Sequence, residues 1–310
     1  MKDPQLDALV AAVTREVQAR LANPSAPPRP APDPEGCSVP GRTTPCHATK
    51  DSCTNHGHCL VRKPEVVEKM VAEGASRIGA GPGMARPDSA LAAMIDHTLL
   101  KPDATRDQLV KVCEEARQYH FATVCVNSAN IPLVASLLKG SGVKPIAVVG
   151  FPLGAASTAS KAFEAREAVR QGALEIDMVL NIGALKSRDY KMVQEDIAKV
   201  VEASRPHKVK VILETSMLSD EEKVIASVLS KAGGAHFVKT STGFGGGGAT
   251  VADIQLMRRV VGTDMEVKAS GGIRTRQDAD TMVAAGADRI GASASVSIVT
   301  GATDKKTSGY

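Results

Sequence analysis

The sequence has no tryptophan and little aromatic content of any kind. Among its 310 residues, Phe, Trp and Tyr together make up 3%. Proteins that bind single-stranded nucleic acid stack the bases on aromatic side chains, so this scarcity argues against such a function. The formal net charge is only +4, and Lys and Arg are scattered among Asp and Glu. Without a basic stripe, we expect no nucleic-acid partner.

Long apolar runs are also missing. No segment approaches the roughly 20 apolar residues that a membrane-spanning helix needs. The first residues, MKDPQLDALVAAV, lack the basic and apolar regions of a secretory signal. We therefore expect a cytoplasmic protein with no membrane partner. In that compartment the six Cys are expected to be thiols or metal ligands rather than disulfides.

The first 36 residues combine a predicted helix with a proline-rich linker. In residues 3–21, Asp3 can cap an amphipathic helix whose Leu and Val side chains form one stripe. Residues 22–36 carry six prolines in fifteen positions, which is typical of a semi-rigid linker. A helix this short is marginal alone, so it either binds a partner surface or folds back on its own domain.

This arrangement resembles the encapsulation peptides that target enzymes into bacterial microcompartments. The resemblance implies that residues 3–21 bind microcompartment shell proteins or other cargo, and that the protein is located inside a microcompartment.

Residues 37–88 form a second extension, which begins with a cluster of Cys and His. Cys37, Cys46, Cys53 and Cys59 lie within 23 residues, together with three His. Such ligands can hold zinc or an iron–sulfur cluster. The segment has no C-x-x-C pair, so an unmetallated thiol cluster is the alternative. Further on, residues 70–81 match residues 282–293 at nine of twelve positions, which indicates duplication of one helix–strand unit.

From residue 89 onward, apolar strand patterns alternate with helical ones. The eight predicted strands are residues 92–100, 121–127, 145–151, 174–181, 208–215, 236–242, 265–270 and 289–294. Helical patterns lie between them, for example at residues 105–120 and 187–205. This alternation predicts an α/β fold, a (β/α)8 TIM barrel over residues 89–310. An open doubly wound sheet is the alternative.

The sixth predicted strand leads into a glycine-rich stretch that allows two interpretations. Gly243, Gly245 and Gly248 satisfy G-x-G-x-x-G, a pattern of dinucleotide-binding loops. That fingerprint normally opens the first βαβ unit, whereas here it follows the sixth strand. We therefore favour the other interpretation, in which the glycines let the backbone approach a phosphate beside Lys239.

Ionisable side chains occur near the carboxyl ends of the predicted strands, where barrel enzymes place their active sites. Lys239 and Lys268 lie on the sixth and seventh strands, and Asp96 and Asp177 on the first and fourth. A lysine attacks a carbonyl only as the neutral amine, and both burial and a second ammonium group lower its pKa. The two lysines and two aspartates together predict Schiff-base chemistry. The alternative is that they form a structural network of salt bridges.

These residues lie in segments that resemble the deoxyribose-phosphate aldolases, class I aldolases with a (β/α)8 fold. The segments run in order from about residue 93 to 295: IDHTLLKPDAT, VCVN, VVGFPLG, EIDMVLNIGAL, VKTSTGFG, VKASGGIRT and RIGASA. The resemblance implies reversible cleavage of 2-deoxy-D-ribose 5-phosphate to D-glyceraldehyde 3-phosphate and acetaldehyde, with no cofactor for the aldol reaction. It also implies a phosphorylated sugar as substrate, and we expect a homo-oligomer. Another small-aldehyde aldolase, or a weakly active cargo scaffold, is the alternative.

The same resemblance implies roles for individual residues. Lys239 is the Schiff-base lysine and Lys268 the second lysine that lowers its pKa. Asp177 transfers protons with a water molecule, Asp96 organises the network, and Cys125 lies near the substrate aldehyde. Some relatives end in a Tyr that reaches the active site, which makes Tyr310 a further candidate.

A phosphate site is expected where the last three strands end. The segments STG (241–243), SGG (270–272) and GAS (291–293) can direct backbone N–H groups at one anion. The expected residues are Gly243, Gly272, Gly291 and Ser293. Phe244 stands where some relatives carry a phosphate-binding lysine, so this chain departs from the family pattern there.

Overall fold

The computed structural model describes residues 89–301, together with residues 8, 11, 12, 14 and 15. These five are helical, in agreement with the helix predicted over residues 3–21. The rest of that segment, the linker at 22–36 and the extension at 37–88 lie outside the described residues.

Residues 89–301 form a closed parallel barrel of eight strands in the order β1 to β8. The strands are β1 (Ile95–Leu99), β2 (Thr123–Asn127), β3 (Lys144–Val149), β4 (Glu175–Val179), β5 (Lys208–Ile212), β6 (Phe237–Lys239), β7 (Glu266–Ser270) and β8 (Arg289–Ala292). Closure is direct, because Ile95 of β1 pairs with Ile290 of β8. The predicted (β/α)8 barrel is confirmed, and the doubly wound alternative is wrong.

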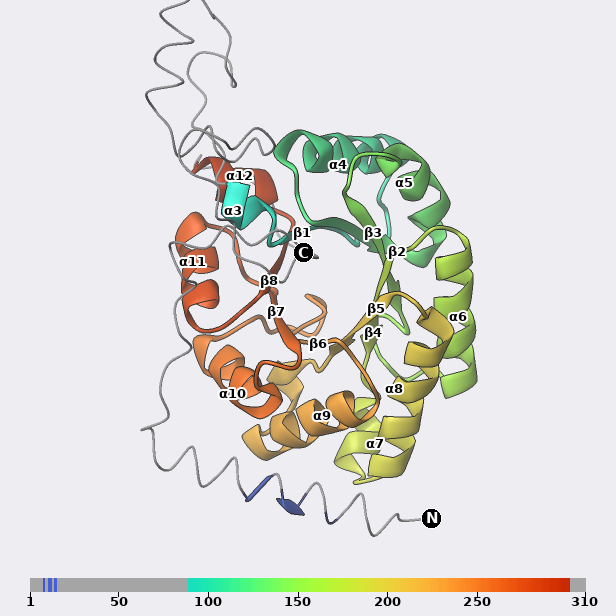
Figure 1. Cartoon of the computed structure of the whole chain (residues 1–310), viewed down its shortest axis with the longest axis vertical. Coiled ribbons are helices and arrows are strands. Elements are labelled where there is room, and N and C mark those ends of the chain that lie inside the picture. The colour runs from blue at the N-terminus through green and yellow to red at the C-terminus, as the bar shows by residue number, and fades with distance from the viewer. Residues whose placement is uncertain (1–7, 9–10, 13, 16–88, 302–310) are drawn as a thin grey trace, which may run out of the picture. The chain divides into compact units, whose positions relative to one another are not determined.

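Helices form a ring outside the barrel (Figure 1); the first precedes β1, the last follows β8, and those between them connect successive strands. They are α3 (Ser89–Ala92), α4 (Arg106–Tyr119), α5 (Ile131–Leu138), α6 (Thr158–Arg170), α7 (Ile182–Lys186), α8 (Tyr190–Ser204), α9 (Asp220–Ala232), α10 (Val251–Val261), α11 (Arg276–Ala284) and α12 (Ser295–Thr300). Two 3-10 turns, η2 (Ser128–Asn130) and η3 (Thr215–Met217), follow β2 and β5 closely. Helices α4, α9 and α11 each begin with a capping box. These caps fix the ends of the loops that follow β1, β5 and β7.

The outward side chains of the strands make the main hydrophobic core. Ile176 and Met178 of β4, with Val209 and Val211 of β5, are fully buried in the cluster that the helices cover. Each such side chain stabilises the fold by about 1.5–3 kcal/mol. Because side chains alternate along a strand, the residues between them point into the barrel. The outer face thus supplies the stability, and the inner face is available for other chemistry.

The first and sixth predicted strands are too long. The first predicted strand begins at residue 92, but this residue belongs to α3. The apolar run that begins there is divided between one helical turn and β1. The sixth strand, predicted over 236–242, is assigned only to Phe237–Lys239. Beyond it, Thr240 still donates its N–H to Lys268 O at 3.1 Å. The chain therefore stays extended between its neighbours past the formal end of β6.

In the described part of the chain, no helix has the length and apolar character needed to cross a membrane.

Candidate active site

Lys239, Lys268 and Asp177 meet inside the barrel. Lys239 and Lys268 are register partners on β6 and β7, and Asp177 lies on β4. The Nζ atoms of Lys239 and Lys268 both donate to Asp177 Oδ2, at 2.9 and 2.8 Å. None of the three residues is more than 3% exposed. One carboxylate oxygen therefore links two buried lysines.

Asp96 of β1 contacts Lys268 from a second direction. Lys268 Nζ lies 2.6 Å from Asp96 Oδ2. The other oxygen of Asp96 accepts hydrogen bonds from Thr123 Oγ1 at 2.7 Å and from Arg289 Nη1 at 2.8 Å. Lys268 thus lies between two carboxylates, whereas Lys239 has one carboxylate partner among the described residues.

This difference separates the pKa values of the two lysines. Burial lowers the pKa of Lys239, with a further contribution from the charge of Lys268, and Asp177 alone does not offset them. Burial also acts against the charge on Lys268, but Asp177 and Asp96 outweigh it and raise the pKa of Lys268. Lys239 is therefore the lysine that more readily becomes a neutral nucleophile, and Lys268 keeps its charge.

Three further buried or half-buried residues, Lys210, Glu175 and Arg289, join the network, and the sequence analysis missed them. Lys210 Nζ, fully buried, donates to Glu175 Oε2 at 2.5 Å and to Asp177 Oδ1 at 2.9 Å. Arg289 enters through its contact with Asp96. The missed signal is the period of two: Glu175 precedes Asp177 by two residues on β4, so both face inward.

Leaving aside the half-exposed Lys144, which contacts Glu175 from the edge of the network, the charges balance only when one basic group is neutral. The basic groups are Lys210, Lys239, Lys268 and Arg289, and the carboxylates are Asp96, Asp177 and Glu175. With all four basic groups protonated, the buried set carries one excess positive charge. Because an uncompensated charge is costly in a low-dielectric interior, this count also favours a neutral Lys239.

Cys125 faces the barrel interior from β2. It is fully buried and packs with Leu100, Ile146 and Val148. Burial, followed by the charge of Asp177, raises the pKa of the Cys125 thiol to about 11. The thiol therefore stays protonated near neutral pH and forms an apolar wall beside the lysines, rather than a second nucleophile.

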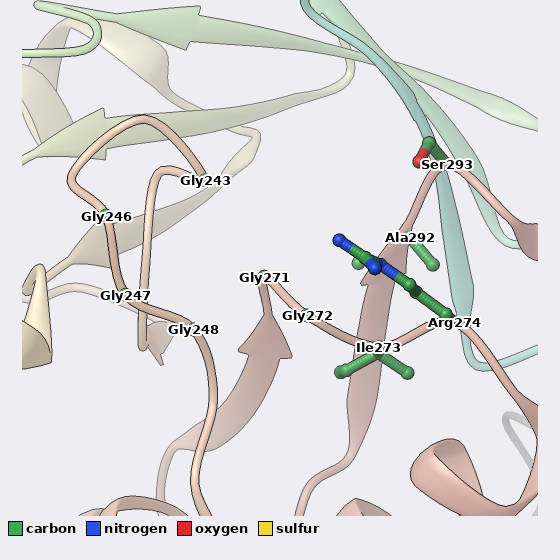
Figure 2. Close-up of a pocket in the computed structure, with 11 residues that line it drawn as sticks. Gly243, Gly246, Gly247, Gly248, Gly271, Gly272, Ile273, Arg274, Ala292 and Ser293 are labelled. Atoms are coloured by element: carbon green, nitrogen blue, oxygen red, sulfur yellow. The ribbon is translucent and has the colours of Figure 1, made fainter. Parts of the chain in front are cut away.

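The four residues expected to bind phosphate line one cavity. Gly243, Gly272, Gly291 and Ser293 surround a volume of about 360 Å³ at the ends of β6, β7 and β8. Most of its wall is glycine backbone (Figure 2). The sequence analysis did not single out Arg274, whose side chain extends from the β7–α11 loop into this cavity (Figure 2). A basic residue so soon after the SGG segment was the available signal.

Glycines in the β6–α10 loop allow it to pack tightly on its neighbours. A Cβ on Gly248 would lie 2.6 Å from Gly271 O, and a Cβ on Gly245 would lie 2.7 Å from Glu214 Cδ. The buried carboxylate of Glu214 accepts hydrogen bonds from the backbone N–H and the hydroxyl of Thr242. These contacts hold the loop against the segments that follow β5 and β7, and so shape the cavity.

Phe244 projects from the same loop toward a second aromatic ring. Its ring meets that of Phe151 edge-on, with centroids 5.3 Å apart, and the residue is 42% exposed. Phe244 and Phe151 therefore place apolar surface between the β3 and β6 loops.

Several predicted site residues lie outside the described part of the chain. These are Tyr310 and the four candidate metal ligands Cys37, Cys46, Cys53 and Cys59. Of the predicted partner-binding helix at residues 3–21, only the five positions given above are described. Within the described residues, no group of three or more His, Cys, Asp or Glu side chains is arranged to hold a metal ion.

Comparison with known proteins identifies one family. A model for DeoC/LacD family aldolases matches residues 90–303. A deoxyribose-phosphate aldolase from Coprothermobacter proteolyticus is 60% identical over 206 residues, 66% of this chain and 94% of the relative. One from Staphylococcus carnosus is 58% identical over 210 residues, 68% and 96% of the two chains. The tetrameric deoxyribose phosphate aldolase from Aeropyrum pernix superposes with a TM-score of 0.65 at 32% identity, covering 75% of this chain and 96% of that one.

Proposed function

The chain belongs to the DeoC/LacD family of aldolases, and on that premise we propose that it is a class I aldolase for 2-deoxy-D-ribose 5-phosphate. The products are D-glyceraldehyde 3-phosphate and acetaldehyde, and the reaction is reversible. One observation carries the proposal: a buried lysine with a lowered pKa, Lys239, lies beside a carboxylate and a second, charged lysine.

Lys239 makes the covalent bond. Its neutral Nζ attacks the C1 aldehyde of the open-chain sugar, and loss of water leaves an iminium ion. When a base takes the proton of the C3 hydroxyl, the C2–C3 bond breaks and its electron pair moves into the iminium, which gives an enamine and releases D-glyceraldehyde 3-phosphate. Protonation of the enamine at C2 and hydrolysis then release acetaldehyde and restore the amine.

Asp177 and Lys268 support these proton transfers. Burial alone would raise the pKa of Asp177, but Lys210, Lys239 and Lys268 outweigh it and hold that pKa well below its usual value. A water molecule hydrogen-bonded to this carboxylate would carry the proton between the substrate and Asp177. Lys268 remains charged and disfavours protonation of Lys239.

The cavity at the ends of β6, β7 and β8 suits the phosphate of this substrate. Backbone N–H groups of a glycine-rich wall are good donors to phosphate oxygens. Arg274 adds a positive charge with the planar, forked donor geometry that matches phosphate. Together, the backbone N–H groups and Arg274 would compensate for the phosphate-binding lysine that some relatives carry at the position of Phe244.

Borohydride trapping tests the proposal directly. With acetaldehyde and borohydride, we expect the mass of the full chain to increase by one reduced ethylidene group, which peptide mapping places on Lys239. Lys239→Ala should give no adduct, and Lys139→Ala, which removes an exposed lysine, should behave like the unmodified protein. A folded protein that gives no adduct on Lys239 would overturn the aldolase assignment.

The N-terminal extension supports a second proposal, on location. Residues 3–21 and the proline-rich linker have the pattern of an encapsulation peptide, and enclosure suits a reaction that releases a volatile, reactive aldehyde. We expect residues 1–36, fused to a fluorescent protein, to collect at co-expressed microcompartment shells. The same fusion with Leu9→Glu and Val13→Glu, which interrupts the apolar stripe, should be diffuse. Diffuse fluorescence from the unmodified fusion would contradict targeting.

A homo-oligomer is the expected form of the enzyme. The relative from Aeropyrum pernix is described as tetrameric, and light scattering on the full chain measures whether this protein assembles too.

A further inference from the structure

Ser241 and Ser270 each bury a hydroxyl group that has no hydrogen-bond partner among the described residues. Ser241 is fully buried and Ser270 is 7% exposed. Nearly all buried hydroxyls in proteins are paired, because an unpaired one loses its bonds to water and gains nothing. Two such groups, one just after β6 and one at the end of β7, need an explanation.

Both serines lie one step beyond the catalytic lysines. Ser241 follows Lys239 by two residues and Ser270 follows Lys268 by two, so each shares the inward face of its lysine. A Cβ on Gly291 would lie 2.5 Å from Ser270 Oγ and 3.0 Å from Lys268 Cε, and Gly291 also lines the phosphate cavity. The Ser270 hydroxyl is therefore between the lysine layer and that cavity.

The unpaired hydroxyl of Ser270 is not the result of a loose backbone. Thr240 Oγ1 donates to Ser270 O at 3.0 Å, and Ser270 N donates back to Thr240 Oγ1 at 3.0 Å. This reciprocal pair fixes the backbone of Ser270 on β7. On the neighbouring strand β8, Gly291 is the register partner of Ser270, and the absence of a side chain there makes room for the Ser270 hydroxyl itself. The unpaired hydroxyl is therefore carried on a fixed backbone, next to Gly291 of the cavity wall.

We propose that Ser270, assisted by Ser241, binds the C4 hydroxyl of the phosphosugar and selects for it. This inference rests on the proposed function. With C1 on Lys239 and the C5 phosphate in the glycine-lined cavity, C3 and C4 span the region between them. The C3 hydroxyl loses its proton during cleavage, so it faces Asp177. The C4 hydroxyl needs its own partner, and a serine hydroxyl can both donate and accept.

Two acceptor aldehydes test the assignment in the bond-forming direction with acetaldehyde. D-glyceraldehyde 3-phosphate carries the relevant hydroxyl on its C2, and 3-oxopropyl phosphate has a hydrogen there. We expect Ser270→Ala to lower kcat/KM for D-glyceraldehyde 3-phosphate by about 5-fold, the size of one neutral hydrogen bond. The value for 3-oxopropyl phosphate should not change. Ser241→Ala should show a smaller loss of the same selectivity.

Ser230→Ala is the matched control, because it also removes a buried serine hydroxyl. Ser230 Oγ donates to Ala226 O within α9 at 2.7 Å, so this variant should melt at a lower temperature and keep the wild-type preference between acceptors. Ser270→Ala removes an unpaired polar group and should melt at the same temperature as wild type or higher. A lower melting temperature with equal losses on both acceptors would assign Ser270 a structural role and overturn the inference.

The trapped acetaldehyde adduct separates this inference from the proposed function. An adduct on Lys239 in wild type and Ser270→Ala, with an unchanged preference between the two acceptors, overturns the inference alone. Failure of the wild-type protein to form the adduct overturns the proposed function and the inference with it.

Discussion

At the scale of single residues, two lysines on neighbouring strands acquire opposite properties from their partners. Lys268 contacts two carboxylates and its pKa rises, whereas Lys239 contacts one and its pKa falls. Burial acts against the charge of both, so the number of carboxylates decides the direction. The proposed nucleophile, Lys239, therefore differs from Lys268 in having no second carboxylate partner among the described residues.

Lys210 should tune the nucleophile through Asp177. Lys210→Met removes a positive charge beside Asp177, so Asp177 holds a proton on Lys239 more strongly and the pKa of Lys239 rises. Because only the neutral amine attacks, kcat/KM increases as pH rises through that pKa. We expect the rise to move to higher pH by about one unit, so that kcat/KM falls by about 10-fold at pH values well below the pKa of Lys239 and is unchanged well above it. A pH profile of kcat/KM measures this.

Two variants control for disruption of the buried network. Lys210→Arg keeps the charge and should keep the profile. Lys210→Met combined with Glu175→Gln removes one charge of each sign, so the profile should return toward that of wild type. If Lys210→Met lowers activity equally at every pH, Lys210 has no influence on the pKa of Lys239.

Sequence reasoning found four members of the buried network and missed three, although Lys210 and Arg289 are register partners of Asp177 and Lys268. Lys239, Lys268, Asp177 and Asp96 were identified because carboxyl ends of barrel strands mark active sites. Lys210 was missed, because a buried ion pair forms only when β4 and β5 align in register and sequence alone does not give contacts across strands.

At the scale of elements, the β6–α10 loop is shaped by contacts that only glycine permits. Gly248→Ala places a Cβ 2.6 Å from Gly271 O, a backbone atom that cannot turn aside. We expect destabilisation of about 1–3 kcal/mol and a higher KM for the phosphorylated substrate, since both glycines line the cavity. Thermal melting and kinetics with 2-deoxyribose 5-phosphate and unphosphorylated 2-deoxyribose measure the two effects.

Gly183→Ala, at the start of α7, is the control for glycine replacement itself. Its new Cβ would meet nothing closer than Asn181 Oδ1 at 3.7 Å, so stability and KM should stay near wild type. An unchanged KM for the phosphorylated substrate in Gly248→Ala would mean that the loop does not shape the phosphate site.

Element types were predictable here, and element ends were less so. The apolar runs located all eight strands, because strands buried on their outer face carry strong signals. The run before β1 concealed the short helix α3, since one helical turn has too few residues for a period. The end of β6 depends on hydrogen bonds to β5 and β7, which no local pattern encodes.

At the scale of the whole molecule, the barrel contains its own core and the network of lysines and carboxylates. The relative from Coprothermobacter proteolyticus is covered over 94% of its length by 206 residues of this chain, so it has no counterpart for most of residues 1–88. We expect a variant that starts at Ala85 to have the melting temperature of the full chain and a kcat/KM within about twofold of the full chain's value. A loss of activity in the folded variant would assign the extension a part in catalysis.

The wall of the cavity proposed to bind phosphate is mainly peptide backbone, and this affects how its sequence can change in evolution. A side chain that binds phosphate is lost by one codon change, but a backbone N–H persists through every substitution except proline. Mutations in this wall can obstruct the ligand by adding bulk, yet few can delete a donor. Phosphate binding should therefore change slowly in evolution. The side chains of Ser241 and Ser270, which lie between the lysines and the cavity, can be lost by one substitution each, and the preference between acceptor aldehydes would then change.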